Sequence, residues 1–108
     1  MTYNRDKAYA ERITLHVDAD FKSLLPGFIE DWQAEISAMR AALENNDYET
    51  IRRIGHDMKG IGGSCGLDDI TSLGGSLSES ARAMDLELIR ENLDRLSEYL
   101  HRVEFVYE

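Results

Sequence analysis

Residues that break helices are confined to a few places in this chain of 108 residues. The only proline is Pro26, and five of the eight glycines lie between Gly55 and Gly66. Proline and glycine are the residues that most disfavour a helix interior. Most of the chain is therefore free to be helical, and the glycine-rich segment is an exception that needs an explanation.

Four stretches carry apolar residues at the three- and four-residue steps of an amphipathic helix. The first runs from Pro26 to Leu43, and the second runs from about Asp47 to Cys65. The third follows a cap at Asp68 or Asp69, and the fourth follows a cap at Asp85. The apolar positions are Phe28, Ile29, Trp32, Ile36, Met39 and Leu43, then Tyr48, Ile51, Ile54 and Met58, then Ile70, Leu73, Leu77, Ala81 and Met84, then Leu88 or Ile89, Leu93, Leu96, Leu100 and Val103.

Short turns join these stretches, which favours antiparallel packing of neighbouring helices. Residues 45–47 read as a turn, and Gly66 is expected to end the second helix. We therefore predict an all-α fold, an antiparallel four-helix bundle over residues 18–108. An additional short N-terminal helix or segment, residues 1–17, is expected to lie across one end.

That N-terminal segment carries two different signals. Residues 5–14 are compatible with a short helix, whereas the β-branched alternation of residues 13–17 favours an extended strand. Asp18 or Asp20 is expected to cap the next helical segment.

Composition excludes several classes of function. The formal net charge is −9, which argues against a nucleic-acid partner and against docking on an anionic membrane. There is no apolar run long enough to span a bilayer, and the single cysteine, Cys65, allows no internal disulfide. His16 and His101 have no partners at metal-ligand spacing, so we expect no metal site. We expect a monomer located in the cytoplasm.

The glycine-rich segment breaks the helical pattern in an informative way. Gly60, Gly62 and Gly63 would each cost about 0.5–1 kcal/mol in a helix interior relative to alanine. Positions 56, 60 and 63 share one helix face, at steps of four and three residues. That face would present the imidazole of His56 followed by two residues without side chains.

Basic residues surround this histidine in the predicted helix. Lys59 follows it by three residues, and Arg52 and Arg53 precede it by about one turn. A neutral imidazole is a competent nucleophile near neutral pH, and a nearby cation offsets the charge of a transferred phosphoryl group. Bare positions beside the ring would let a second protein approach it. The pattern predicts phosphoryl transfer, with Arg52, Arg53, Gly60 and Gly63 on the docking face.

The segment from His56 to Gly66 resembles the H-x-x-K-G-x-x-x-x-x-G signature of histidine-containing phosphotransfer (HPt) domains. His56, Lys59, Gly60 and Gly66 occupy the signature positions. The flanking helical stretches are similar to those of the family as well, over roughly residues 18–104. The resemblance implies a four-helix bundle with the histidine exposed midway along one helix.

The resemblance also implies roles and partners. His56 would be the phospho-acceptor and Lys59 the phosphoryl-stabilising cation, while Gly60 keeps the surface open. The chain would be a phosphocarrier rather than an enzyme, accepting a phosphoryl group from a receiver-domain aspartate or a hybrid histidine kinase and passing it to another receiver. It would need no cofactor of its own, because Mg²⁺ belongs to the receiver.

One position departs from the family pattern. Many relatives have Glu or Gln twelve residues after the last motif glycine, where the side chain can hold the other ring nitrogen of the histidine. Here that residue is Ser78, followed by Glu79. Which group orients the His56 ring is left open.

Two other functions remain open alternatives. The chain could be the phospho-accepting piece of a histidine kinase, although it has neither the proline after the motif nor an ATPase domain. It could also be an interaction module that binds receivers without being phosphorylated. There is no phosphate-binding P-loop, so autophosphorylation from ATP is not expected. The acidic set Glu30, Asp31, Glu35, Glu44 and Glu49 is interpreted as a solvated face.

Overall fold

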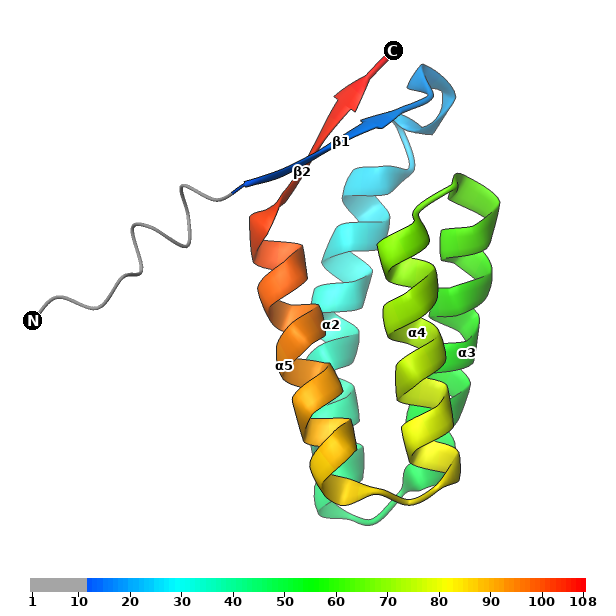
Figure 1. The fold of residues 1–108 in the computed structure, drawn as a ribbon, viewed down its shortest axis with the longest axis vertical. Helices are drawn as coiled ribbons and strands as arrows, with labels where there is room; N and C mark the ends of the chain where they lie inside the picture. Colours follow the sequence, from blue (N-terminus) through cyan, green and yellow to red (C-terminus); the bar gives the residue numbers. More distant parts are fainter. Residues whose placement is uncertain (1–11) are drawn as a thin grey trace, which may run out of the picture.

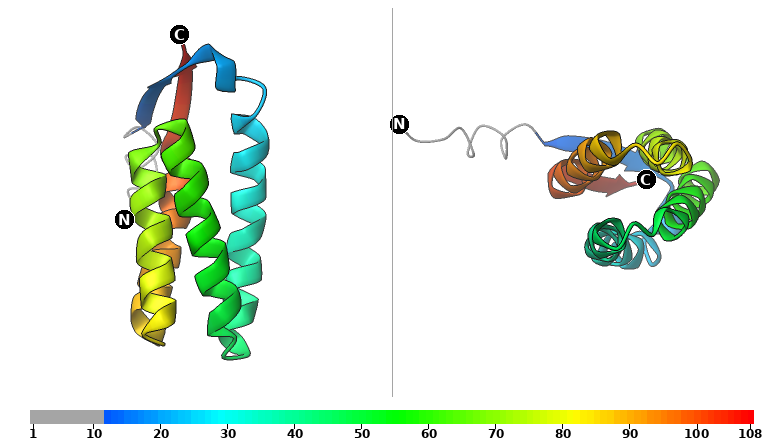
Figure 2. Two further views of the ribbon diagram at one scale, coloured as in Figure 1. Left: turned by 90° about the vertical axis from the view of Figure 1, so that its right-hand side faces the viewer. Right: turned by 90° about the horizontal axis from the view of Figure 1, so that it is seen from below.

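Four long helices stand side by side in the computed structural model, which describes residues 12–108 (Figure 1). They are α2 (Leu25–Glu44), α3 (Tyr48–Cys65), α4 (Asp68–Arg82) and α5 (Leu86–Arg102). Each helix runs antiparallel to the next, and the four are arranged in chain order around the bundle (Figure 2). The predicted antiparallel four-helix bundle is confirmed.

The apolar stripes of the four helices meet in one core. Trp32, Ile51, Leu77 and Leu93, one from each helix, are at most 2 % exposed. Ile89 rather than Leu88 faces the core, since Leu88 is 41 % exposed. Burial of these stripes is the main favourable contribution to folding.

Helix ends follow local chemistry at most of the predicted positions. The Asp47 side chain accepts a hydrogen bond from the Thr50 amide at 3.2 Å and caps α3, and Asp85 caps α5 in the same way. Gly66 ends α3 in the left-handed region with a φ of 71°, a conformation that glycine adopts without strain. The turn predicted at residues 45–47 is also present.

Three predictions about helix ends are wrong. Neither Asp68 nor Asp69 caps α4, because both lie inside its first turn and Leu67 precedes them as N-cap. Met84 lies beyond α4 with a φ of 54° and is 64 % exposed, so it leaves the apolar stripe. Val103 does not extend α5, because the backbone there becomes extended and pairs with a strand.

A two-stranded parallel sheet crosses one end of the bundle (Figure 1). Strand β1 (Ile13–Val17) pairs with β2 (Val103–Tyr107), in the register Ile13 to Val103 and Val17 to Tyr107. A single 3-10 turn, η1 (Ala19–Phe21), follows β1 and is capped by Asp18. The extended conformation predicted for residues 13–17 is confirmed, and the helical alternative is wrong at residues 12–14. Its remaining part, residues 5–11, lies outside the described residues.

No helix in residues 12–108 is both long and apolar enough to cross a membrane.

Candidate functional site

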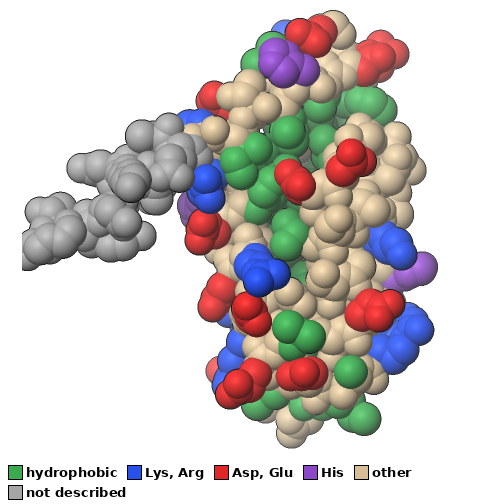
Figure 3. Space-filling view, in the orientation of Figure 1, with side chains coloured by type: hydrophobic (Ala, Val, Ile, Leu, Met, Phe, Trp, Pro, Cys, Tyr) green, Lys and Arg blue, Asp and Glu red, His purple; other side chains and the backbone are tan. Residues whose placement is uncertain are grey.

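His56 lies midway along α3 with its side chain exposed. It makes no hydrogen bond or ion pair within residues 12–108. In the space-filling view, a histidine and several basic side chains gather along the edge of the molecule formed by α3 (Figure 3). The ring is thus open to solvent and to a second molecule.

Two glycines on the same side of α3 leave the surface beside the ring empty. A Cβ built on Gly60 or on Gly63 meets no heavy atom within 4 Å. Both residues are exposed. A partner can therefore approach His56 from this side without meeting a side chain at these two positions.

The other glycines of α3 serve the opposite purpose. A Cβ on Gly55 would lie 2.8 Å from the carbonyl oxygen of Gly74, and one on Gly62 would lie 2.8 Å from the amide nitrogen of Thr71. Helices α3 and α4 thus touch backbone to backbone behind the exposed histidine. The sequence analysis did not predict this contact. The signal for it was that Gly55, Gly62 and Gly74 lie inside two consecutive helical stretches.

The three basic residues near His56 differ in their surroundings. Arg52 is held by Glu49 through two hydrogen bonds of 2.9 and 2.6 Å, which offset much of its charge. Arg53 is exposed and acts electrostatically on Glu35 of α2. Lys59 is exposed and makes no ion pair within residues 12–108. Of the three, Lys59 is therefore the cation that we expect to act on a charge at the ring.

A small acidic cluster lies on the α2 side of this site. Partial burial, and then the negative charges of Asp31 and Asp57, raise the pKa of Glu35, while Arg53 opposes the shift. Glu35 was interpreted from the sequence as part of a solvated face, but it is half-buried between α2 and α3. Only the packing of these two helices brings Asp57 close to it.

The position where the family pattern is broken faces the helix contact. Ser78 is 7 % exposed, and its amide nitrogen would lie 2.8 Å from a Cβ on Gly55. Neither Ser78 nor Glu79 forms a hydrogen bond with His56. Glu79 is exposed and lines a shallow groove of about 790 Å³ over α4, together with Lys59 and Gly75.

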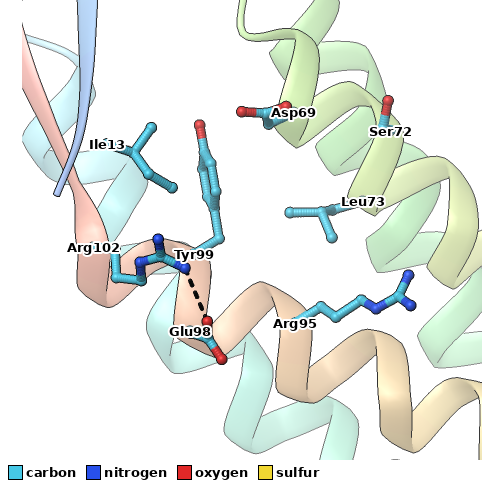
Figure 4. Close-up of a pocket in the computed structure, with 8 residues that line it drawn as sticks. All are labelled: Ile13, Asp69, Ser72, Leu73, Arg95, Glu98, Tyr99 and Arg102. Carbon is cyan, nitrogen blue, oxygen red and sulfur yellow. Dashed lines mark hydrogen bonds and ion pairs between the residues drawn. The ribbon is translucent and has the colours of Figure 1, made fainter. Parts of the chain in front are cut away.

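A separate pocket of about 370 Å³ lies between α4, α5 and β1 (Figure 4). Ile13, Leu73 and the ring of Tyr99 form its apolar wall. Burial and the negative charge of Asp69 raise the pKa of Tyr99 above its ordinary value. His56 does not line this pocket, so the pocket is separate from the site on α3. Elsewhere in residues 12–108, no group of three or more His, Cys, Asp or Glu side chains lies close enough to hold a metal ion.

Comparison with known proteins gives one result that decides the family. The model of the family described as Hpt domain matches residues 23–105, which is most of the chain. The chain belongs to the Hpt domain family. The match spans all four helices and includes the start of β2, whereas β1 precedes it. Neither the comparison with curated proteins nor the comparison with solved structures gives a match.

Membership in this family makes the chain a histidine phosphotransfer module, and such modules are phosphocarriers. Within the Hpt bundle, α3 carries an exposed histidine, two bare positions beside it and one lysine that makes no ion pair with any described residue.

Proposed function

We propose that this Hpt domain is a phosphorelay intermediate with His56 as its phospho-acceptor. The observation that carries the proposal is the exposed imidazole of His56 beside the open positions Gly60 and Gly63. A receiver domain must bring a phosphorylated aspartate into contact with the ring, and these positions leave room for it. The receiver supplies Mg²⁺, so this chain needs no cofactor of its own.

The transfer step balances without any further reactant. The lone pair of the unprotonated ring nitrogen attacks phosphorus, and the bond from phosphorus to the aspartate oxygen breaks. The carboxylate leaves with the electron pair, and the second ring nitrogen keeps its proton until solvent removes it. The phosphoryl oxygens stay negative throughout, and the Lys59 ammonium stabilises them electrostatically. Donation to a second receiver is the reverse of this step.

The partners implied by this proposal are receiver domains and, upstream, a histidine kinase. The direct test uses phosphoramidate, a small phosphodonor that needs no docking, and a receiver charged with acetyl phosphate. Wild-type protein is expected to acquire an acid-labile, base-stable label from both donors.

The variant His56→Gln is expected to lose this label completely. Its melting temperature should change little, because an exposed side chain without partners contributes little to stability. His101→Gln, which replaces another exposed histidine, is the matched control and should label normally. Undiminished labelling of His56→Gln would overturn the proposal and favour a receiver-binding module that is not phosphorylated.

A further inference from the structure

Gly75 is a helix-interior glycine that close packing does not explain. Its neighbour Gly74 is in backbone contact with α3, because a Cβ there would lie 2.7 Å from both the Gly55 carbonyl oxygen and the Lys59 amide nitrogen. A Cβ on Gly75 would instead meet a single atom within 4 Å, the Cδ of Lys59 at 3.6 Å. That distance is ordinary van der Waals contact, so a methyl group fits at this position.

The contact shows where the aliphatic part of Lys59 lies. Its Cδ lies beside the place where a Cβ of residue 75 would stand, at one edge of the groove over α4. Lys59 makes no ion pair or hydrogen bond within residues 12–108, so no polar contact among these residues fixes its ammonium group. A side chain at position 75 can therefore change the path of the methylene groups, and with it the direction of the ammonium group.

We propose that Gly75 is a positioning residue for Lys59. Because it has no side chain, it leaves space for the lysine to extend towards the phosphoryl group on His56. The inference rests on the proposed function, because it assumes that Lys59 stabilises that group. Side-chain atoms beyond Cβ at position 75 would occupy the space of the lysine methylenes. The ammonium would then be turned away from its resting direction, while the fold of α4 would be kept.

Valine is the most informative replacement for Gly75. Its two γ-methyl groups are held in a single preferred rotamer in helices, so the side chain does not readily turn away from Lys59. Helix propensity does not oppose the change, since valine is no worse than glycine in a helix interior. Gly27→Val is the matched control, because Gly27 is an exposed helical glycine of α2 with nothing within 4 Å of its Cβ position.

The experiment is a double-mutant cycle on the initial rate of labelling by phosphoramidate. Lys59→Ala is expected to slow labelling by about tenfold or more, as for loss of one charge-stabilising group. Gly75→Val should slow labelling by about threefold or more, because it turns the same charge away from the phosphoryl group. The double variant should label no more slowly than Lys59→Ala alone. Gly27→Val should label at the wild-type rate.

The coupling between the two positions separates positioning from a general structural effect. Additive losses in the double variant, or a wild-type rate for either Gly75→Val or Lys59→Ala, would overturn the inference. The wild-type protein gives a second test that needs no variant. Nuclear Overhauser contacts are expected between the Lys59 δ-protons and the Gly75 α-protons, and their absence would also overturn it. Failure of the proposed function looks different, since wild-type protein would then not be labelled at His56 at all.

Discussion

Gly62 and Gly63 are neighbours in the sequence, yet they have opposite surroundings. A Cβ on Gly62 would collide with the backbone of α4, whereas one on Gly63 would stand in open space. Successive residues in a helix are rotated by about 100°, which is enough to move from the packed face to the exposed face. One residue type therefore serves helix packing at one position and access to His56 at the next.

This contrast predicts opposite changes in stability. Gly62→Ala should lower the free energy of unfolding by about 1–3 kcal/mol, because the added methyl forces α3 and α4 apart. Gly63→Ala should raise it by up to about 1 kcal/mol, because alanine is the better helix former. Urea unfolding followed by circular dichroism measures both values. Equal effects at the two positions would show that the rotation of α3 about its axis has been assigned wrongly.

Glu35 is a second residue whose behaviour depends on its neighbours. Burial and the charges of Asp31 and Asp57 raise its pKa, so the folded state favours the protonated carboxyl more than the unfolded state does. The corresponding contribution to stability is present at low pH and is lost as the pH rises through the folded-state pKa.

Glu35→Gln should accordingly be more stable than wild type at pH 7. The difference should shrink as the pH falls through the raised pKa of Glu35 and vanish once the carboxyl is protonated in both states. Melting temperatures of both proteins, measured at intervals of about half a pH unit between pH 3 and pH 7, would test this change. Glu30→Gln, at an exposed carboxylate of the same helix, is the control for loss of one negative charge. A destabilised Glu35→Gln at pH 7 would contradict the expected sign.

At the scale of the element, α3 has two working faces. Its inner face meets α4 through glycine contacts, and its outer face presents His56 with Gly60 and Gly63 beside it. The close contact on the inner face anchors the helix against α4. The outer face can then remain bare without loosening the bundle.

Adding a large side chain to the outer face should separate docking from chemistry. Gly63→Leu is expected to reduce transfer from a charged receiver by about tenfold or more, because the new side chain lies between His56 and the approaching partner. Labelling by phosphoramidate should stay near the wild-type rate. Equal receiver-dependent rates in the variant and the wild type would move the docking face away from Gly63.

At the scale of the whole molecule, the sheet ties the two ends of the described chain together. Residues Ile13 and Val103 are paired although the whole bundle lies between them in the sequence. Hydrogen bonds from the Ala19 amide to the Glu108 carbonyl and from the Glu108 amide to the Val17 carbonyl extend this connection. Leu15 and Phe105 turn towards the core, while Thr14 and Glu104 face outwards.

The sheet is expected to contribute to the stability of the bundle without taking part in phosphotransfer. Leu15→Ser should lower the free energy of unfolding by about 1–2 kcal/mol, because it removes apolar surface packed on the core. Thr14→Ser keeps the hydroxyl that bonds Glu104 and should change stability by less than about 0.5 kcal/mol. Both variants should be labelled by phosphoramidate like wild type. A Leu15→Ser variant as stable as wild type would show that β1 is not packed on the bundle in solution.

The sequence alone determined the four helices, most of their ends and the bare face beside His56. These features depend on local spacing: apolar residues every three or four positions, Asp47 and Asp85 before helices, and Gly66 after one. Such signals act within one or two helical turns, so they are readable without knowing what packs against the helix. The same spacing assigned His56, Gly60 and Gly63 to one side of α3.

Only the tertiary structure decided which neighbours cover each face. The pairing of β1 with β2 joins segments about ninety residues apart, and the alternation of apolar and polar residues in a short strand does not show which strand pairs with it. The half-burial of Glu35 needs α2 beside α3, and the role of Gly62 needs the backbone of α4 within contact distance. Periodicity specifies a direction from the helix axis, whereas burial, pKa shifts and close packing depend on the atoms that lie in that direction.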